Sequence, residues 1–187
     1  STYVKQIESV VAPRIKRIMG KDYDQSYTEA AGAVFSRLYE DTGGMDMTSI
    51  ARTAGSMIDR ATKAELQTAP DVLMERAFYG AAVYNANPAK GKEMFTTPSG
   101  KEPSLTALGK VGSAMQQRLA TFNSALAKEG KDPATLGELS DIEYQRFKAL
   151  PEDKKKQFYL KSRAGENNDN GQYAGMSPFA IWLMESN

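Results

Sequence analysis

Apolar residues recur every three or four positions along much of this chain, which is the spacing that gathers them on one face of an α-helix. The most regular run extends from Leu105 to Leu126, and Ser104 directly before it has the side chain of a helix N-cap. Alternating runs of β-branched residues, which are typical of half-buried strands, are nearly missing. The sequence therefore predicts an all-α fold.

Further helices are predicted wherever a capping or helix-starting residue precedes an apolar run. The expected starts are near Val4, at the capping box Ser26–Glu29, at Asp46 or Thr48, at Thr68–Asp71, at a second capping box Ser140–Glu143, at Pro151 and at Ser177–Pro178. Pro13 is expected to interrupt the first helix, because proline lacks the backbone donor, and Gly20 to end it. The second helix is expected to end at Gly43, so that Glu40 falls in its last turn.

Two polar stretches predict long surface loops. Residues Asn85 to Ser104 are rich in Pro, Gly, Lys, Thr and Ser, and we expect at most one short turn there, around Met94 and Phe95. The stretch from Gly165 to Met176 is also polar. Loops as long as the first are uncommon inside compact domains and tend to be lids, binding loops or disordered segments.

The chain contains neither histidine nor cysteine among its 187 residues, which excludes several kinds of chemistry. Ser-His-Asp and Cys-His triads, the usual zinc sites, thiol redox chemistry and histidine-ligated haem all need one or both residue types. Any catalysis must rest on carboxylates, hydroxyls, amides, lysine or arginine. We therefore expect no metal and no other cofactor.

The charge balance and the hydropathy narrow the class of partner. The 24 basic and 23 acidic side chains nearly cancel, so nucleic-acid binding is not expected of the whole molecule. One alternative keeps Arg14, Arg17 and Lys154–Lys156 as a local DNA-binding surface. No stretch has the ~18–20 apolar residues of a transmembrane segment, and the first residues lack the basic-then-apolar layout of a secretory signal peptide.

Glu40 is the residue that best fits a catalytic role. A carboxylate in the last turn of a helix lies at the negative end of the helix dipole, and Asp41 adds a second negative charge, so both are expected to raise the pKa of Glu40. A carboxylic acid that stays protonated near neutral pH suits glycoside cleavage, because the leaving oxygen must take up a proton. The alternative is a solvated glutamate at a helix end.

Four patches of sequence, in order along the chain, carry a resemblance to a known family. They are Ser36–Gly44, Ile50–Arg60, Pro70–Phe78 and Ala125–Thr135. They resemble the spore-cortex-lytic-enzyme-like cell wall hydrolases, in which a helix ends in a Tyr-Ala-Glu-Ala-x-Gly-Glu-like stretch and a following helix ends in Asn-Arg. Glu40, Gly43 and Arg60 match the family in type and order. Asp59 stands where the family has Asn, and Gly44 stands where the family has an acidic residue.

This resemblance implies a lysozyme-like helical domain with long loops that cuts the MurNAc–GlcNAc bond of a peptidoglycan glycan strand. The enzyme would be a lytic transglycosylase or muramidase with Glu40 as its general acid/base. A transglycosylase needs no second carboxylate, whereas a hydrolytic lysozyme would, and Asp46 is then the nearest candidate. We expect one domain over residues 1–187, with an N-terminal helix at 1–24, a candidate catalytic core at 25–135 and C-terminal helices at 136–187 packing on the core.

Glycan binding also needs hydrogen-bonding groups and flat apolar surfaces. The candidate substrate contacts are Tyr39, Thr48, Ser49, Phe78, Tyr79, Tyr84, Gln172 and Tyr173. For each Tyr the alternative is a ring in the core with its hydroxyl at the edge. Glu166–Gly171 places oxygen-bearing side chains as a calcium loop does, but the twelfth position is Ser177 rather than Glu, so a polar turn is expected instead.

Without a secretory signal, such an enzyme would reach the bacterial cell wall as a bacteriophage lysin, as a virion-associated protein, or on release from the host cytoplasm. Virion or other assembly partners are then expected. The main alternative is a non-enzymatic helical structural or assembly protein of a virion, in which Glu40 is an ordinary helix-end residue. The two differ in whether Glu40 lines a concave groove flanked by tyrosines.

Overall fold

The computed structural model describes residues 2–42, 47–69, 75–77, 79–81, 83–84 and 88–186. Its elements are α1 (Thr2–Met19), a 3-10 turn η1 (Gly20–Asp22), α2 (Gln25–Thr42), α3 (Met47–Asp59), α4 (Lys63–Gln67), α6 (Pro88–Phe95), α7 (Leu105–Lys128), α8 (Leu136–Lys148), α9 (Glu152–Glu166) and α10 (Pro178–Glu185). Residues 75–77, 79–81 and 83–84 are also helical, and this part of the chain contains no strand. The all-α prediction is confirmed.

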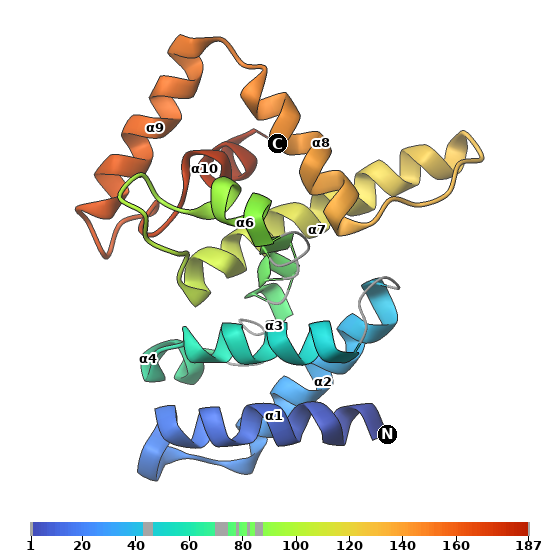
Figure 1. Cartoon of the computed structure of the whole chain (residues 1–187), viewed down its shortest axis with the longest axis vertical. Helices are drawn as coiled ribbons and strands as arrows, with labels where there is room; N and C mark the ends of the chain where they lie inside the picture. The colour runs from blue at the N-terminus through green and yellow to red at the C-terminus, as the bar shows by residue number, and fades with distance from the viewer. Residues whose placement is uncertain are drawn as a thin grey trace.

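The first three helices pack on one another as a layer at the N-terminal side of the molecule (Figure 1). Ile7, Val11 and Ile15 recur on one face of α1 and are completely buried, as are Ile50 and Ile58 of α3. Burying aliphatic side chains of this size contributes about 1.5–3 kcal/mol each. The core of this layer therefore follows the apolar stripes that the sequence shows.

The prediction that Pro13 interrupts the first helix is wrong, since α1 runs unbroken from Thr2 to Met19 with Pro13 inside it. A proline in a helix interior costs about 3 kcal/mol or more. Here Val11 and Ile15, on either side of the proline, are both buried in the layer, and this burial offsets the missing hydrogen bond. The helix ends where predicted, at Gly20, which has a φ of +57°.

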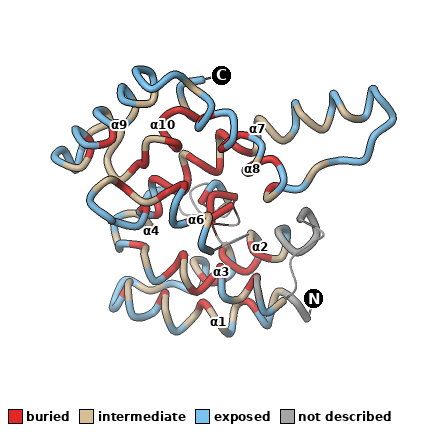
Figure 2. The backbone as a smooth tube through the Cα atoms, turned by 45° about the horizontal axis from the view of Figure 1, so that its top comes forward, coloured by how far each residue is buried: buried red, intermediate tan, exposed pale blue. Residues whose placement is uncertain are grey.

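The C-terminal half of the chain is organised around α10, which contacts α6, α7, α8 and α9. Figure 2 shows this short helix as buried among more exposed neighbours. Phe179 lies 5.6 Å from Phe95, 5.1 Å from Tyr144 and 5.9 Å from Trp182, measured between ring centroids. Aromatic pairs at such distances contribute about 0.5–1.5 kcal/mol beyond the area they bury, so this cluster fixes α10 among its neighbours.

The segment 75–84 crosses α7 at backbone contact. A Cβ added to Gly112 would lie 1.8 Å from the carbonyl oxygen of Arg76, and one added to Gly80 would lie 2.0 Å from that of Leu108. Only glycine at both positions permits this approach. The crossing places Arg76, in the described end of the Pro70–Phe78 patch, against helix α7.

Several helix starts differ from prediction. Helix α2 begins one residue before the expected box, and the Ser26 amide donates to Asp24 Oδ1 at 2.7 Å. Helix α8 begins at Leu136 with Thr135 as its cap, so that Ser140 and Glu143 lie inside it and are buried. Of the helix start expected at Thr68–Asp71, Thr68 and Ala69 are not helical, and Pro70 and Asp71 lie outside the described residues. The caps at Ser104 and Ser177, and the start after Pro151, are as predicted.

The expected loop from Asn85 to Ser104 contains helix α6, which is a further correction. Its composition is polar, but Met94 and Phe95 at its end are buried against α10, and Ser177 donates from its hydroxyl to the Met94 carbonyl at 2.6 Å. Tertiary contacts thus stabilise a helix that the local sequence does not favour. No helix in the described part of the chain is long and apolar enough to cross a membrane.

Candidate functional site

Helix α2 carries the principal candidate, Glu40. The helix ends at Thr42, so the backbone of Glu40 lies in its last turn, as the sequence predicts. Tyr39 precedes it in the same turn. The side chains of Tyr39, Glu40 and Asp41, and all of Asp46, fall outside what the structure describes.

One turn before Glu40, Arg37 pairs with Glu75 at an N–O distance of 2.6 Å. Both side chains are exposed by more than a third, so the pair contributes at most about 1 kcal/mol. The pair matters here because of the segments that it joins. The pair brings the start of the segment 75–84 against the C-terminal turns of α2, which is where the candidate acid is located.

Tyr84, a predicted sugar contact, instead packs within the protein. Its side chain is buried, the Arg60 guanidinium carbon lies 4.6 Å from its ring centroid, and its hydroxyl donates to Glu102 at 3.1 Å. Arg60 in turn pairs with Glu102 at 3.0 Å. Burial raises the pKa of the Tyr84 phenol. The alternative reading of this tyrosine, a core ring with its hydroxyl at the edge, therefore holds.

Glu65 was not predicted, yet it joins the two halves of the molecule. One carboxylate oxygen accepts from the Thr62 amide at 3.1 Å and completes the N-terminal capping box of α4. The other accepts from the Thr106 amide at 2.8 Å and from the Thr106 hydroxyl at 2.6 Å, in the first turn of α7. The Thr-x-x-Glu spacing at residues 62–65 is the signal that sequence reasoning missed.

The other predicted substrate contacts that the structure describes lie on different elements. Tyr79 is buried, Thr48 is exposed near the start of α3, and Gln172 is exposed while its carbonyl accepts from Lys110 at 2.8 Å. Tyr173 donates to Glu185 beside α10. The side chains of Ser49 and Phe78 are outside the described part. Tyr84 bonds Glu102 whereas Tyr173 bonds Glu185, so these two predicted contacts have different partners.

The two basic clusters are partly neutralised. Arg14 and Arg17 both pair with Asp59 at 3.1 Å, and Lys155 pairs with Glu152 at 2.8 Å. They belong to α1 and α9, which lie at opposite ends of the molecule in Figure 1. This arrangement gives no support to a joint DNA-binding surface.

The described residues include no group of three or more acidic side chains that could hold a metal ion. Glu166, at the start of the calcium-like sequence, accepts from the Ser99 amide at 2.9 Å. That hydrogen bond lowers the pKa of its carboxyl. The carboxylate thus ties the 167–175 turn to the loop after α6.

Comparisons with protein-family models, with curated proteins and with solved structures found no match.

Proposed function

We propose that this protein cleaves the glycan strand of peptidoglycan, as a lytic transglycosylase or muramidase, with Glu40 as its general acid/base. The observation that carries the proposal is the position of Glu40 in the last turn of α2, the position of the acid in the family that the sequence resembles. The Arg37–Glu75 pair supports it, since it brings a second of the four resembling patches to that helix end. A lysozyme-like arrangement of the domain belongs to the same proposal.

The reaction needs a single carboxyl group. Protonated Glu40 donates its proton to the glycosidic oxygen as the bond to the anomeric carbon breaks and the sugar gains oxocarbenium character. The resulting carboxylate then takes the proton of the 6-hydroxyl of the same muramic sugar, whose oxygen bonds to the anomeric carbon. The products are a free 4-hydroxyl end and a 1,6-anhydro end. The carboxyl is regenerated, and no histidine or metal takes part.

The experiment is digestion of isolated cell walls, with the released muropeptides weighed by mass spectrometry. Fragments lighter by one water indicate a transglycosylase, and ordinary reducing ends indicate a hydrolase. Glu40→Gln keeps the size of the side chain but cannot donate the proton, so we expect a rate loss of at least ~100-fold with unchanged circular dichroism. Glu29→Gln, at an exposed residue near the start of the same helix, is the matched control and keeps full activity. An active Glu40→Gln variant would refute the assignment.

A second candidate is a non-enzymatic structural or assembly protein of a virion. Two observations favour it. Tyr79 and Tyr84 are buried rather than open to a sugar, and the last turns of α7 with the loop that follows project from the body of the molecule (Figure 1). Wild-type protein that releases no fragments from walls of several bacterial types would favour this candidate over the enzyme.

A further inference from the structure

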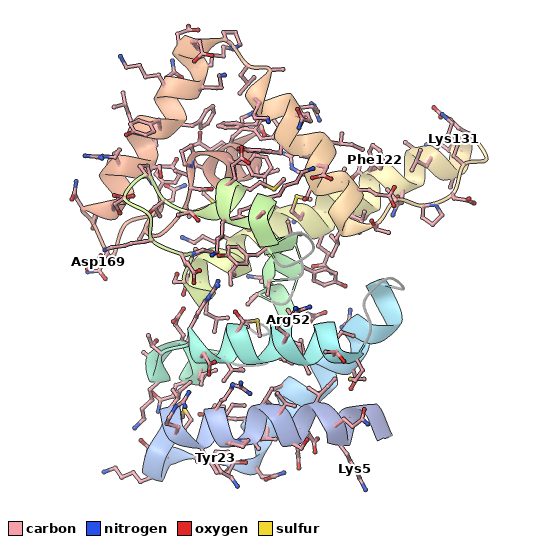
Figure 3. The ribbon with its side chains drawn as sticks, viewed as in Figure 1. Lys5, Tyr23, Arg52, Phe122, Lys131 and Asp169 are labelled. Atoms are coloured by element: carbon pink, nitrogen blue, oxygen red, sulfur yellow. The ribbon has the colours of Figure 1, made fainter. Side chains whose placement is uncertain are left out.

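An open hollow of about 530 Å³ lies between α7 and α8, beside the C-terminal end of α10. Its lining includes Arg118, Phe122, Leu139, Glu143, Arg146 and Ser186. Phe122 lies where α7 passes α8 (Figure 3). Hollows of this size suit small molecules, and this one combines an apolar wall with a charged one.

The charged wall carries an excess of one positive charge. Glu143 is almost fully buried, and both of its oxygens are already bonded: Oε2 to Arg118 Nη1 at 2.9 Å and Oε1 to Arg146 Nη1 at 3.0 Å. Two guanidinium groups therefore share one carboxylate. One carboxylate balances one of these two positive charges, so the cluster can accept one further negative charge.

Arg118 is fixed in place and cannot serve as a mobile ligand. Its Nη2 donates to the carbonyl oxygens of Leu183, at 2.9 Å, and Ser186, at 3.1 Å, so it caps the end of α10. Its Nε is buried and has no hydrogen-bond partner among the described residues. Arg118 is therefore committed to Glu143 and to the end of α10, and the donors that a ligand in the hollow can reach are those of Arg146.

Arg146 supplies the accessible donors. Its side chain is 63% exposed, and the bond to Glu143 uses one of its nitrogens. An arginine side chain has five N–H donors in a planar fork that matches a carboxylate. Across the hollow, Phe122 and Leu139 form the apolar wall.

We propose that this hollow binds a small monocarboxylate with an apolar body, its carboxylate on Arg146 and its apolar part against Phe122 and Leu139. A single surplus charge favours a monoanion over a phosphate dianion. The site does not depend on the proposed cleavage of peptidoglycan, because none of its residues belongs to α2. The ligand is either a free acid or the C-terminal carboxylate of a peptide, which present the same chemistry.

Binding at this site can be followed by intrinsic fluorescence, because Trp182 is the one tryptophan of the chain. The guanidinium carbons of Arg118 and Arg146 lie 5.5 Å and 6.0 Å from the Trp182 ring centroid. The probe is N-acetyl-phenylalanine, and its primary amide is the uncharged control. We expect the acid to change Trp182 fluorescence saturably and the amide to bind at least ~10-fold more weakly, the loss of one charge-assisted hydrogen bond. Equilibrium dialysis repeats both titrations without relying on fluorescence.

Three variants measure how much the charged wall and the apolar wall each contribute to binding, and whether the loss of any arginine has the same effect. Arg146→Gln should weaken binding of the acid at least ~10-fold and leave the amide unaffected. Phe122→Ala should weaken acid and amide equally. Arg163→Gln, which removes an exposed arginine of α9, is the matched control and should change nothing.

The binding measurements on the wild type and the variants decide whether the hollow binds a carboxylate. Preference for the acid that is lost in Arg146→Gln, with circular dichroism unchanged, supports the proposal. Equal binding of acid and amide, no binding of either by dialysis, or an equal loss in Arg163→Gln each overturns it. An acetylated tripeptide ending in phenylalanine, titrated in parallel, distinguishes the sources: tighter binding than the single amino acid indicates a peptide C-terminus, and equal binding indicates a small free acid.

Discussion

Glu185 at the end of α10 lies between two hydrogen-bond donors. Lys161 Nζ donates to both of its oxygens, at 3.1 Å and 2.8 Å, and the Tyr173 hydroxyl donates to one of them. The hydrogen bond from Lys161, with the one from Tyr173, lowers the pKa of Glu185 below its ordinary value of 4.5. In return, the carboxylate raises the pKa of the Tyr173 phenol. The ionised form is therefore the one that the fold stabilises.

This sets the direction of a pH dependence. A carboxyl whose pKa is depressed on folding contributes stability above its unfolded pKa, and the contribution is lost as the pH falls through the folded pKa. We expect Glu185→Gln to be less stable than wild type near neutral pH, and the difference to shrink below pH 4.5. Urea unfolding at several pH values measures this. Glu152→Gln is the control: its side chain is 92% exposed and pairs with one lysine of its own helix, so the loss of stability should be smaller.

For single residues, the sequence predicts the position within a helix better than the burial of the side chain or its partners. Glu40 could be assigned to a helix end because capping and glycine signals surround it. Tyr84 could not be assigned to the core, because its burial depends on Arg60 and Glu102, which reach it from other segments. The Arg118–Glu143 pair was missed for the same reason, since its members lie on different helices.

The crossing of helix α7 and the segment 75–84 requires that Gly112 carries no side chain. In an ordinary helix interior, Gly→Ala stabilises by about 0.5–1 kcal/mol. At Gly112 the new Cβ would lie 1.8 Å from the Arg76 carbonyl oxygen, which belongs to backbone and cannot rotate away. We expect Gly112→Ala to destabilise the protein by about 3 kcal/mol or more, measured by chemical unfolding.

Gly55→Ala is the matched control for that prediction. It also lies inside a helix, but the atoms that its Cβ would meet belong to the Arg14 guanidinium, at 3.0 Å, which can move. We expect a neutral or slightly stabilising effect. Equal losses in the two variants would show that helix α7 does not make the close crossing.

Helix existence was predictable where local signals were sufficient, as for α7 with Ser104 and α10 with Ser177. It was not predictable for α6, whose apolar residues stand only at its end and are held by α10. The Ser140–Glu143 box failed because its spacing also occurs inside a helix, where both side chains turn toward the interior.

Polar contacts help to join the N-terminal and C-terminal halves, among them those of Glu65, which bonds both α4 and α7. We expect Glu65→Ala to lower the unfolding free energy by about 1–2 kcal/mol, because charge-assisted hydrogen bonds to Thr106 are lost along with the capping box. Glu138→Ala removes the equivalent third helical residue of α8, which bonds only Thr135 locally, and should cost less. Differential scanning calorimetry compares them, and equal losses would contradict a joining role for Glu65.

Asn123 and the backbone of Ala134 are joined by two hydrogen bonds, of 3.2 Å and 2.7 Å, which hold the ends of residues 124–133 independently of what lies between them. The Lys131 amide closes the end of α7 on the Leu126 carbonyl at 2.9 Å, so extra chain is best inserted after Lys131. There it adds loop-closure entropy, about 0.6 kcal/mol for each doubling of loop length. A Gly-Ser insert that doubles this loop should therefore leave the melting temperature nearly unchanged, whereas the same insert in an Asn123→Ala background should lower it further. The molecule thus provides a place where a foreign peptide can be displayed, or new termini opened by circular permutation, without disturbing the helices on either side.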